Sequence, residues 1–307
     1  MSHGLGTLKE SFAEYEAWAK DPTPRVGTGL DFIDGRTSGG IARSEVLMLI
    51  AFSSVGKTAV ALNWIRNNPG LPALFFSLEM SRRMLAARLA AMHTGASTRM
   101  LEAKYKAGDV PAEVQETIEA FPMLMFDDSP ALNLKQMKDS MNKASDAIGE
   151  MPRVVVIDYM ELISGAGMST AGEAVDKTAR KVRDWTREFD CSTILLHQVG
   201  KGDGGPGAEP LNITSGRFGG HQPMDYVIGA YAPRLANGVT NSEFERVKDH
   251  LYLQLLKNRA GESQPSGKLH RLDSTCLRLS AWDDKPWADR PPTPHPHDDP
   301  AYGEVIS

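Results

Sequence analysis

The 307-residue sequence has only 2 cysteines, 7% aromatic residues and no apolar run that approaches the length of a bilayer span. Two distant thiols, Cys191 and Cys276, are typical of reduced, buried side chains and not of a disulfide framework. A membrane-spanning helix needs about 20 consecutive apolar residues. Met1 to Lys9 also lacks the basic and apolar segments of a secretory signal. We therefore expect a soluble, cytoplasmic protein with no membrane partner.

An excess of positive charge is also missing. Lysine and arginine number 34 against 39 aspartates and glutamates, which gives a net charge of −5. A protein that coats DNA without regard to sequence is usually basic overall, so this charge balance excludes that class. Any contact with nucleic acid has to come from local basic loops. The 41% of hydrophobic residues is ample for a buried core.

Short apolar runs alternate with segments of helical periodicity along most of the chain. The expected strands cover residues 46–50, 73–78, 123–126, 154–157, 192–196, 226–230 and 251–256, with a hairpin through 269–279. Helices are expected over 8–20, 58–67, 81–93, 134–148 and 172–189, with a further helical region over 98–120. Continuous apolar strands between helices predict an α/β fold, in which a mostly parallel, twisted sheet is covered by helices on both faces.

The composition divides the chain into three parts. Residues 1–24 form a helix and a proline-containing linker, 25–282 form the core, and 283–307 form a tail rich in proline and aspartate that we expect to be disordered. Apolar residues recur at helical spacing in the first part, which is consistent with packing on its own domain or on a neighbouring subunit. Gly200 to Gln222, rich in glycine and proline, is expected to be irregular.

Ala51 to Thr58 follows the first core strand and fits the phosphate-loop pattern, with alanine in place of the first glycine. A loop between a strand and a helix directs backbone N–H groups at one point, and the helix N-terminus adds a positive end. In such a loop the lysine reaches the β- and γ-phosphates and the threonine hydroxyl binds Mg²⁺. The expected nucleotide-binding residues are Ser53, Ser54, Val55, Gly56, Lys57 and Thr58.

Three polar residues follow other expected strands. Asp158 ends the run 154–157 and is placed to act as the second Mg²⁺ ligand beside Thr58. Glu79 follows the strand 73–78 and would lie beside the phosphate loop if the two strands were neighbours; it is equally typical of a helix N-terminus. Gln198 follows the strand 192–196 and is placed to sense the γ-phosphate, whereas its neighbour His197 is more typical of a buried, hydrogen-bonded histidine.

Lys257 and Arg259 follow the strand 251–256. Two cations in this position are consistent with a solvated strand end. They are also consistent with fingers that reach across a subunit boundary and stabilise phosphate charge in a neighbouring site.

The ordered set of motifs resembles the RecA-type motor domain of DnaB-like replicative helicases, with the phage-encoded members closest in size. The resemblance covers about Arg25 to Leu279. It rests on Thr28–Asp31 with Ser38–Gly40, the phosphate loop, Phe76–Ser81, Val156–Tyr159, His197–Gln198, Ser215–Asp225 and Lys257–Arg259.

The resemblance implies an ATP-dependent DNA helicase of a phage or bacterial cell that uses ATP and Mg²⁺. It implies that Glu79 is the general base, Gln198 the sensor, and Lys257 and Arg259 the fingers acting in trans. It further implies a ring, typically a hexamer, that moves along single-stranded or forked DNA during replication. The family's DNA-contacting region falls on the Gly-rich segment, whose basic residues are Lys201 and Arg217.

The same RecA-like core serves other functions, because a fold does not settle an activity. A recombination or repair ATPase, or a DNA-end processing protein that binds DNA without processive unwinding, is the main alternative. An ATP-binding assembly factor without motor activity is a third.

Overall fold

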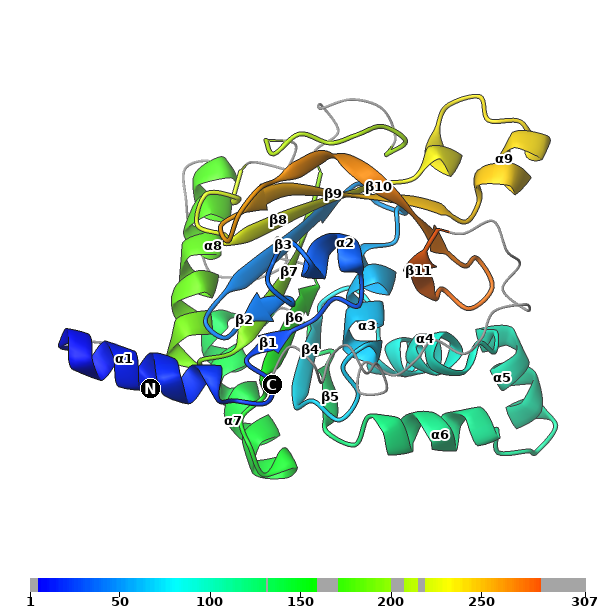
Figure 1. The fold of residues 1–307 in the computed structure, drawn as a ribbon. Helices are drawn as coiled ribbons and strands as arrows, with labels where there is room; N and C mark the ends of the chain where they lie inside the picture. Colours follow the sequence, from blue (N-terminus) through cyan, green and yellow to red (C-terminus); the bar gives the residue numbers. More distant parts are fainter. Residues whose placement is uncertain (1–4, 131, 159–170, 200–206, 215–218, 283–307) are drawn as a thin grey trace.

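The core of the protein is a nine-stranded sheet in a computed structural model that describes residues 5–130, 132–158, 171–199, 207–214 and 219–282 (Figure 1). The strand order is β11-β10-β9-β8-β3-β7-β6-β4-β5. The strands are β3 (Val46–Ala51), β4 (Ala73–Ser77), β5 (Leu124–Asp127), β6 (Val154–Asp158), β7 (Ser192–Gln198), β8 (Tyr226–Tyr231), β9 (His250–Asn258), β10 (Gln264–Leu272) and β11 (Leu279–Ala281). A separate antiparallel pair consists of β1 (Arg25–Val26) and β2 (Ile41–Ala42).

The six strands from β8 to β5 are parallel, and β9, β10 and β11 continue the sheet in antiparallel fashion. The mostly parallel sheet predicted from the sequence is therefore confirmed. Parallel strands share a direction, so β3, β7, β6 and β4 all end at the same edge of the sheet. We call this edge the carboxyl edge, and the opposite one the amino edge.

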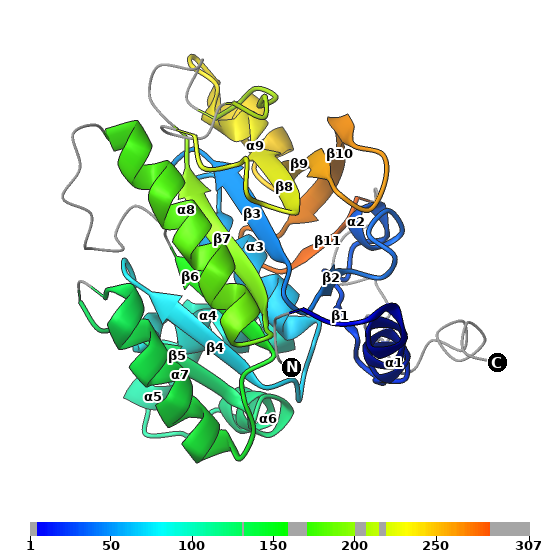
Figure 2. The same ribbon diagram turned by 90° about the vertical axis from the view of Figure 1, so that its left-hand side faces the viewer.

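Helices cover both faces of the sheet (Figures 1 and 2). Helices α7 (Leu134–Ile148) and α8 (Ala171–Glu188) lie on one face, and α2 (Asp31–Asp34), α3 (Lys57–Arg66) and α4 (Arg82–Thr94) lie on the other. The side chains of β3 alternate between the two layers because successive strand residues point to opposite faces. Met48 packs in the cluster that contains α7 and α8, whereas Leu49 packs in the cluster that contains α3.

The expected helical region 98–120 is two helices, α5 (Thr98–Lys106) and α6 (Ala112–Ala120). Gly108 has a φ of 87°, a left-handed conformation that suits glycine, and Pro111 precedes α6 as its cap residue. The predicted hairpin is formed by β10 and β11, and its first strand starts earlier than expected, at Gln264. The sequence analysis also did not predict the 3-10 helix η2 (Pro233–Leu235) or α9 (Asn241–Val247).

The first helix, α1 (Leu8–Ala19), lies outside the layered core and buries none of its residues (Figure 1). Its N-terminus is closed by a capping box, in which the Thr7 hydroxyl accepts the Glu10 N–H and the Glu10 carboxylate accepts the Thr7 N–H. Across the described part of the chain, no helix combines the length and apolar character needed to cross a membrane.

Candidate active site

The phosphate loop connects β3 to α3 at the carboxyl edge of the sheet. Gly56 has a φ of 116°, and a Cβ at this position would lie 3.0 Å from the Leu272 Cδ2, so glycine is favoured by both conformation and space. Ala51 stands where the pattern has its first glycine. It is the last residue of β3 and is fully buried. Its extended backbone needs no glycine, which explains the departure from the pattern.

Arg234 of η2 contacts the backbone of the phosphate loop. The sequence analysis did not identify this residue. Its guanidinium donates to the carbonyl oxygens of Ser54 (3.3 Å) and Val55 (2.9 Å). Burial lowers the pKa of Arg234. The Val55 side chain is itself buried, so the middle of the loop is fixed from two sides. A fixed loop keeps its N–H groups directed at one point, as phosphate binding requires.

The side chains that open α3 take the positions expected of a phosphate site. The Lys57 Nζ lies over the loop and donates to the carbonyl oxygens of Ala51 (3.1 Å) and Phe52 (3.2 Å). The Thr58 hydroxyl donates to the Asp158 Oδ2 at 2.6 Å. The structure therefore brings together Thr58 and Asp158, which the sequence analysis assigned to the same metal ion from positions 100 residues apart.

Asp158 is almost completely buried, with 1% of its surface exposed. The pKa of Asp158 is raised to about 6, chiefly by burial and also by nearby Glu79, although the Thr58 hydrogen bond and the Lys57 ammonium act in the opposite direction. A buried carboxylate disfavours its own charge, so this position favours a bound cation. A carboxylate oxygen and a hydroxyl are hard oxygen ligands of the kind Mg²⁺ prefers, and Thr58 and Asp158 therefore fit such an ion.

Glu79 is exposed and lies two residues beyond the end of β4. The strand order places β7 and β6 between β3 and β4, so the condition that the two strands are neighbours is not met. Glu79 is nevertheless brought to the site through β6, because Ser77 pairs with Asp158 and the Leu78 N–H donates to the Asp158 carbonyl at 2.7 Å. The Ser77 hydroxyl also fixes the following turn through both backbone groups of Met80.

Gln198 is the last residue of β7 and pairs with Ala51 at the start of the phosphate loop. Gln198 is half-buried, and this pairing places it next to the phosphate loop. His197 is completely buried in the same strand, in agreement with the interpretation as a core histidine. Gln198 and Asp158 thus end two adjacent strands at the carboxyl edge, and Glu79 follows the end of the next one, β4.

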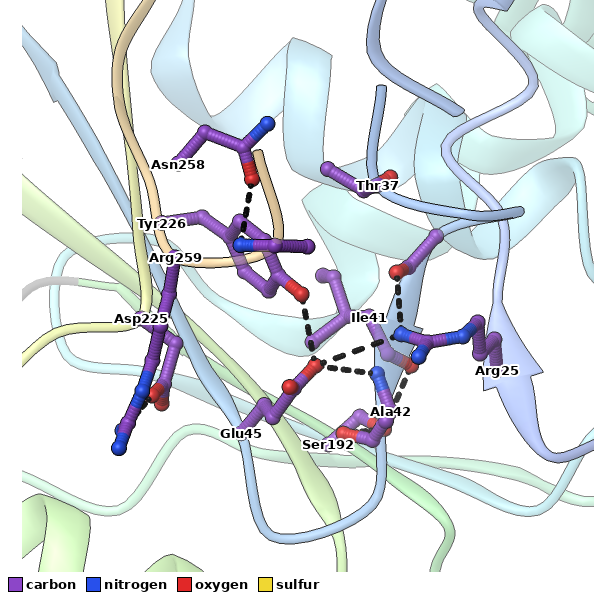
Figure 3. Close-up of polar contacts among 12 residues, drawn as sticks. Arg25, Thr37, Ile41, Ala42, Glu45, Ser192, Asp225, Tyr226, Asn258 and Arg259 are labelled. Carbon is purple, nitrogen blue, oxygen red and sulfur yellow. Dashed lines mark hydrogen bonds and ion pairs between the residues drawn. The ribbon is translucent and has the colours of Figure 1, made fainter. Parts of the chain in front are cut away.

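Lys257 and Arg259 lie at the amino edge, because β9 runs against β8 and Lys257 pairs with Val227 near the beginning of β8. Arg259 forms an ion pair with Asp225 at 2.7 Å, and 60% of its side chain remains exposed (Figure 3). The structure does not bring these two cations to the phosphate loop of the same chain. Lys201 and Arg217, the predicted DNA contacts, lie outside the described residues.

The fold and the loop together define a P-loop NTPase with a RecA-like core. The family model described as DnaB-like helicase C terminal domain matches residues 26–208, which is more than half of the chain. The chain belongs to the DnaB-like helicase C-terminal domain family.

Individual relatives and solved structures also resemble this chain. The chain is 30% identical over 213 residues to the replicative DNA helicase DnaB of Nostoc sp., an alignment that covers 66% of this chain and 23% of that relative. Among solved structures, the ATPase domain of G40P has a TM-score of 0.75 at 18% identity, covering 91% of this chain and all of the other. A DnaB-like replicative helicase, solved in a study of its interactions with primase, has a TM-score of 0.70 at 18% identity and is covered to 68%. These two likenesses show the fold.

The burial of Asp158 predicts that Asp158→Asn stabilises the protein in the absence of nucleotide. The folded pKa of about 6 exceeds the ordinary value of 3.8, so the folded state binds more protons between these values and loses stability as pH rises through that window. At pH 7 the carboxylate then costs about 3 kcal/mol, since one pKa unit corresponds to roughly 1.4 kcal/mol. Thermal unfolding at pH 7 should give a higher Tm for the variant, with the gap closing toward pH 4. An unchanged or lower Tm at pH 7 would contradict the assignment.

Proposed function

We propose that this chain is the ATP-driven motor of a DnaB-like DNA helicase, which couples ATP hydrolysis to movement on single-stranded DNA during replication. One observation carries the proposal: the phosphate loop lies at the carboxyl edge of the sheet, while the cations of the Lys257–Arg259 motif lie at the amino edge. The site of one chain is therefore completed by another chain. The family match over residues 26–208 supports this function over a recombination or repair ATPase.

The separation of the edges supports action in trans. The strand β3 has six residues and leads to the phosphate loop. The Lys257–Arg259 motif pairs with the beginning of β8, which in turn pairs with the beginning of β3. Five steps along a strand cover about 16 Å. An arginine side chain does not bridge that distance back to its own phosphate loop. A finger from a neighbouring subunit supplies positive charge to the transferring phosphoryl group, as in other P-loop NTPases.

Each remaining residue has a distinct role in the proposed reaction. The loop N–H groups and Lys57 bind the phosphates, and Thr58 and Asp158 would hold Mg²⁺. That ion would neutralise phosphate charge when bound. Glu79 is exposed beside these groups and takes a proton from the attacking water. Gln198, which ends β7 next to the loop, responds to the γ-phosphate at the start of the chain segment that leads to Lys201 and Arg217.

We further propose that the subunits assemble into a ring, and that α1 docks on a second copy of the chain. An isolated helix of 12 residues is marginally stable in water, so its exposed apolar side chains need a partner. Leu8, Phe12 and Tyr15 are all more than half exposed, whereas Trp18 is half-buried against the Arg25 guanidinium. A ring of six such contacts is the hexamer expected of the family.

Glu79→Gln tests the hydrolytic role of the glutamate. Loss of a general base lowers a rate by 100-fold or more, so roughly that drop in kcat is expected, with ATP binding preserved because the phosphate loop is intact. Steady-state ATPase rates and equilibrium binding of a fluorescent ATP analogue measure the two properties. Glu102→Gln, an exposed change on α5, is the matched control and should keep the full rate. Normal turnover in Glu79→Gln would remove this residue from catalysis.

The helicase activity is tested with a forked duplex. With ATP and Mg²⁺, the purified protein should separate the strands, and its ATPase rate should rise when single-stranded DNA is added. Electron microscopy of the same sample should show closed rings. Hydrolysis without unwinding, together with open helical filaments on DNA, would instead identify a recombination-type ATPase.

The double substitution Phe12→Ser and Tyr15→Ser tests the docking of α1. It removes the two largest exposed apolar side chains of this helix, so self-association should weaken by at least tenfold, as burial of two aromatic side chains is worth several kcal/mol. Sedimentation velocity measures the assembly, and circular dichroism checks the fold. The control is Ala13→Ser with Glu14→Gln on the same exposed helix. Equal assembly of both proteins would show that α1 has another role.

A further inference from the structure

We propose that Asp225 and Arg183 position Arg259, and that residues 221–225 form a mount for both candidate finger cations. This inference rests on the proposed function. The Asp225 carboxylate is 1% exposed, and its Oδ1 accepts hydrogen bonds from the Arg259 Nη1 at 2.7 Å and from the Arg183 Nη2 at 3.1 Å. Figure 3 shows the Asp225 and Arg259 side chains lying together at the amino edge. One carboxylate oxygen therefore holds two guanidinium groups.

The main chain fixes the same residues. The Arg259 N–H donates to the Asp225 carbonyl oxygen at 3.1 Å, so the two residues are joined through backbone as well as side chain. Asp225 is attached in turn to the first residue of β3, because its Oδ2 accepts the Val46 N–H at 3.0 Å and its own N–H donates to the Val46 carbonyl at 3.0 Å. The mount is therefore anchored to the strand that leads to the phosphate loop.

Arg183 connects the mount to α8. It is mostly shielded, with 15% of its side chain exposed, and it donates to the Pro223 carbonyl as well as to Asp225. About two helical turns before Arg183, the Asp176 carboxylate of α8 accepts the Gly220 N–H at 2.7 Å. The Arg183 and Val46 hydrogen bonds hold the Asp225 carboxylate from two sides, and the carboxylate in turn directs the Arg259 guanidinium.

Lys257 uses the same segment. Its Nζ donates to the Gln222 carbonyl oxygen at 2.8 Å, with the His221 carbonyl at 3.4 Å. Both cations of the motif, which flank Asn258 in the sequence, thus contact residues 221–225. A shift of this short segment moves both cations together.

The exposure of Arg259 distinguishes positioning from plain stabilisation. An ion pair that serves only the fold is typically enclosed by the protein. In contrast, 60% of the Arg259 side chain is exposed, although its guanidinium is bound to Asp225. An unheld arginine samples many rotamers, and ordering it beforehand lowers the cost of reaching the transition state. The planar guanidinium keeps further N–H donors for a phosphate while one is bound to Asp225.

Asp225→Asn tests the mount. It keeps the shape of the side chain but places an amide N–H₂ among donors, so Arg259 loses its fixed direction. We expect the kcat of the assembled protein to fall at least tenfold, with the KM for ATP changed by less than threefold because the phosphate loop lies at the other edge. Lys181→Gln, an exposed charge removal on α8, is the matched control and should keep the full rate. An unchanged kcat in folded Asp225→Asn overturns the inference.

Mixing of subunits separates a finger defect from a damaged fold. Lys57→Ala has a defective phosphate loop and an intact finger, whereas Asp225→Asn has the reverse. If Arg259 acts in trans, a mixture contains interfaces that pair the intact finger with the intact loop. ATPase activity should then rise above that of either variant alone, to at most roughly one quarter of the wild-type rate for random pairing across head-to-tail interfaces. The mixture of Arg259→Ala with Lys57→Ala is the reference. If that mixture regains ATPase activity but the mixture of Asp225→Asn with Lys57→Ala does not, the role of Asp225 is overturned.

Two further variants make every outcome decisive. If Asp225→Asn does not fold, Arg183→Gln decides, because it leaves the carboxylate in place but removes the partner that orients it. A lower kcat that is recovered by mixing with Lys57→Ala supports the mount, and a wild-type kcat overturns it. Arg259→Ala tests the underlying proposal separately. Full activity in Arg259→Ala would refute the role of Arg259 as a finger. Loss of activity in Arg259→Ala, with full activity in Asp225→Asn and Arg183→Gln, would refute only the mount.

Discussion

The direction shared by six parallel strands is the constraint on which the site depends. Residues far apart in the sequence meet because their strands end at one edge: Ala51 pairs with Gln198, and Ser77 pairs with Asp158. The antiparallel strand β9 reverses this order and carries Arg259 to the other edge. The division of the nucleotide site between two subunits that we propose would thus be a consequence of one reversal in strand direction.

The motifs with a local cause could be predicted from the sequence. Continuous apolar runs identified the parallel strands, and the Gly-Lys-Thr turn at Gly56 identified the phosphate loop, because both patterns follow from neighbouring residues. The same local logic placed Asp158 at a strand end, and the hydrogen bond from Thr58 confirms that the two side chains meet. The break at Gly108 was missed because the flanking segments are both helical.

Contacts that depend on strand order could not be predicted in this way. Glu79 was expected beside the phosphate loop on the condition that β3 and β4 are neighbours, but two strands separate them. Arg234 contacts the loop from 180 positions away, and Asp225 meets Arg183 across 42 positions. Arg234 lies in none of the motifs recognised in the sequence, and Asp225 ends the segment Ser215–Asp225 without any residue pattern that points to Arg183. A single sequence contains no signal for such pairings, since they arise only after the sheet has assembled.

Two buried aspartates show how the same side chain serves opposite ends of the molecule. Asp158 and Asp225 are each 1% exposed. Asp225 is neutralised within the protein by two guanidinium groups, so its charge has no further need of a partner. Asp158 is held by the neutral hydroxyl of Thr58 and carries a pKa raised to about 6. A buried carboxylate whose partner is a neutral hydroxyl is unfavourable in its charged form unless a cation is bound beside it. The partners of each aspartate therefore determine its role: Asp158 favours a bound metal ion, and Asp225 fixes an arginine in place.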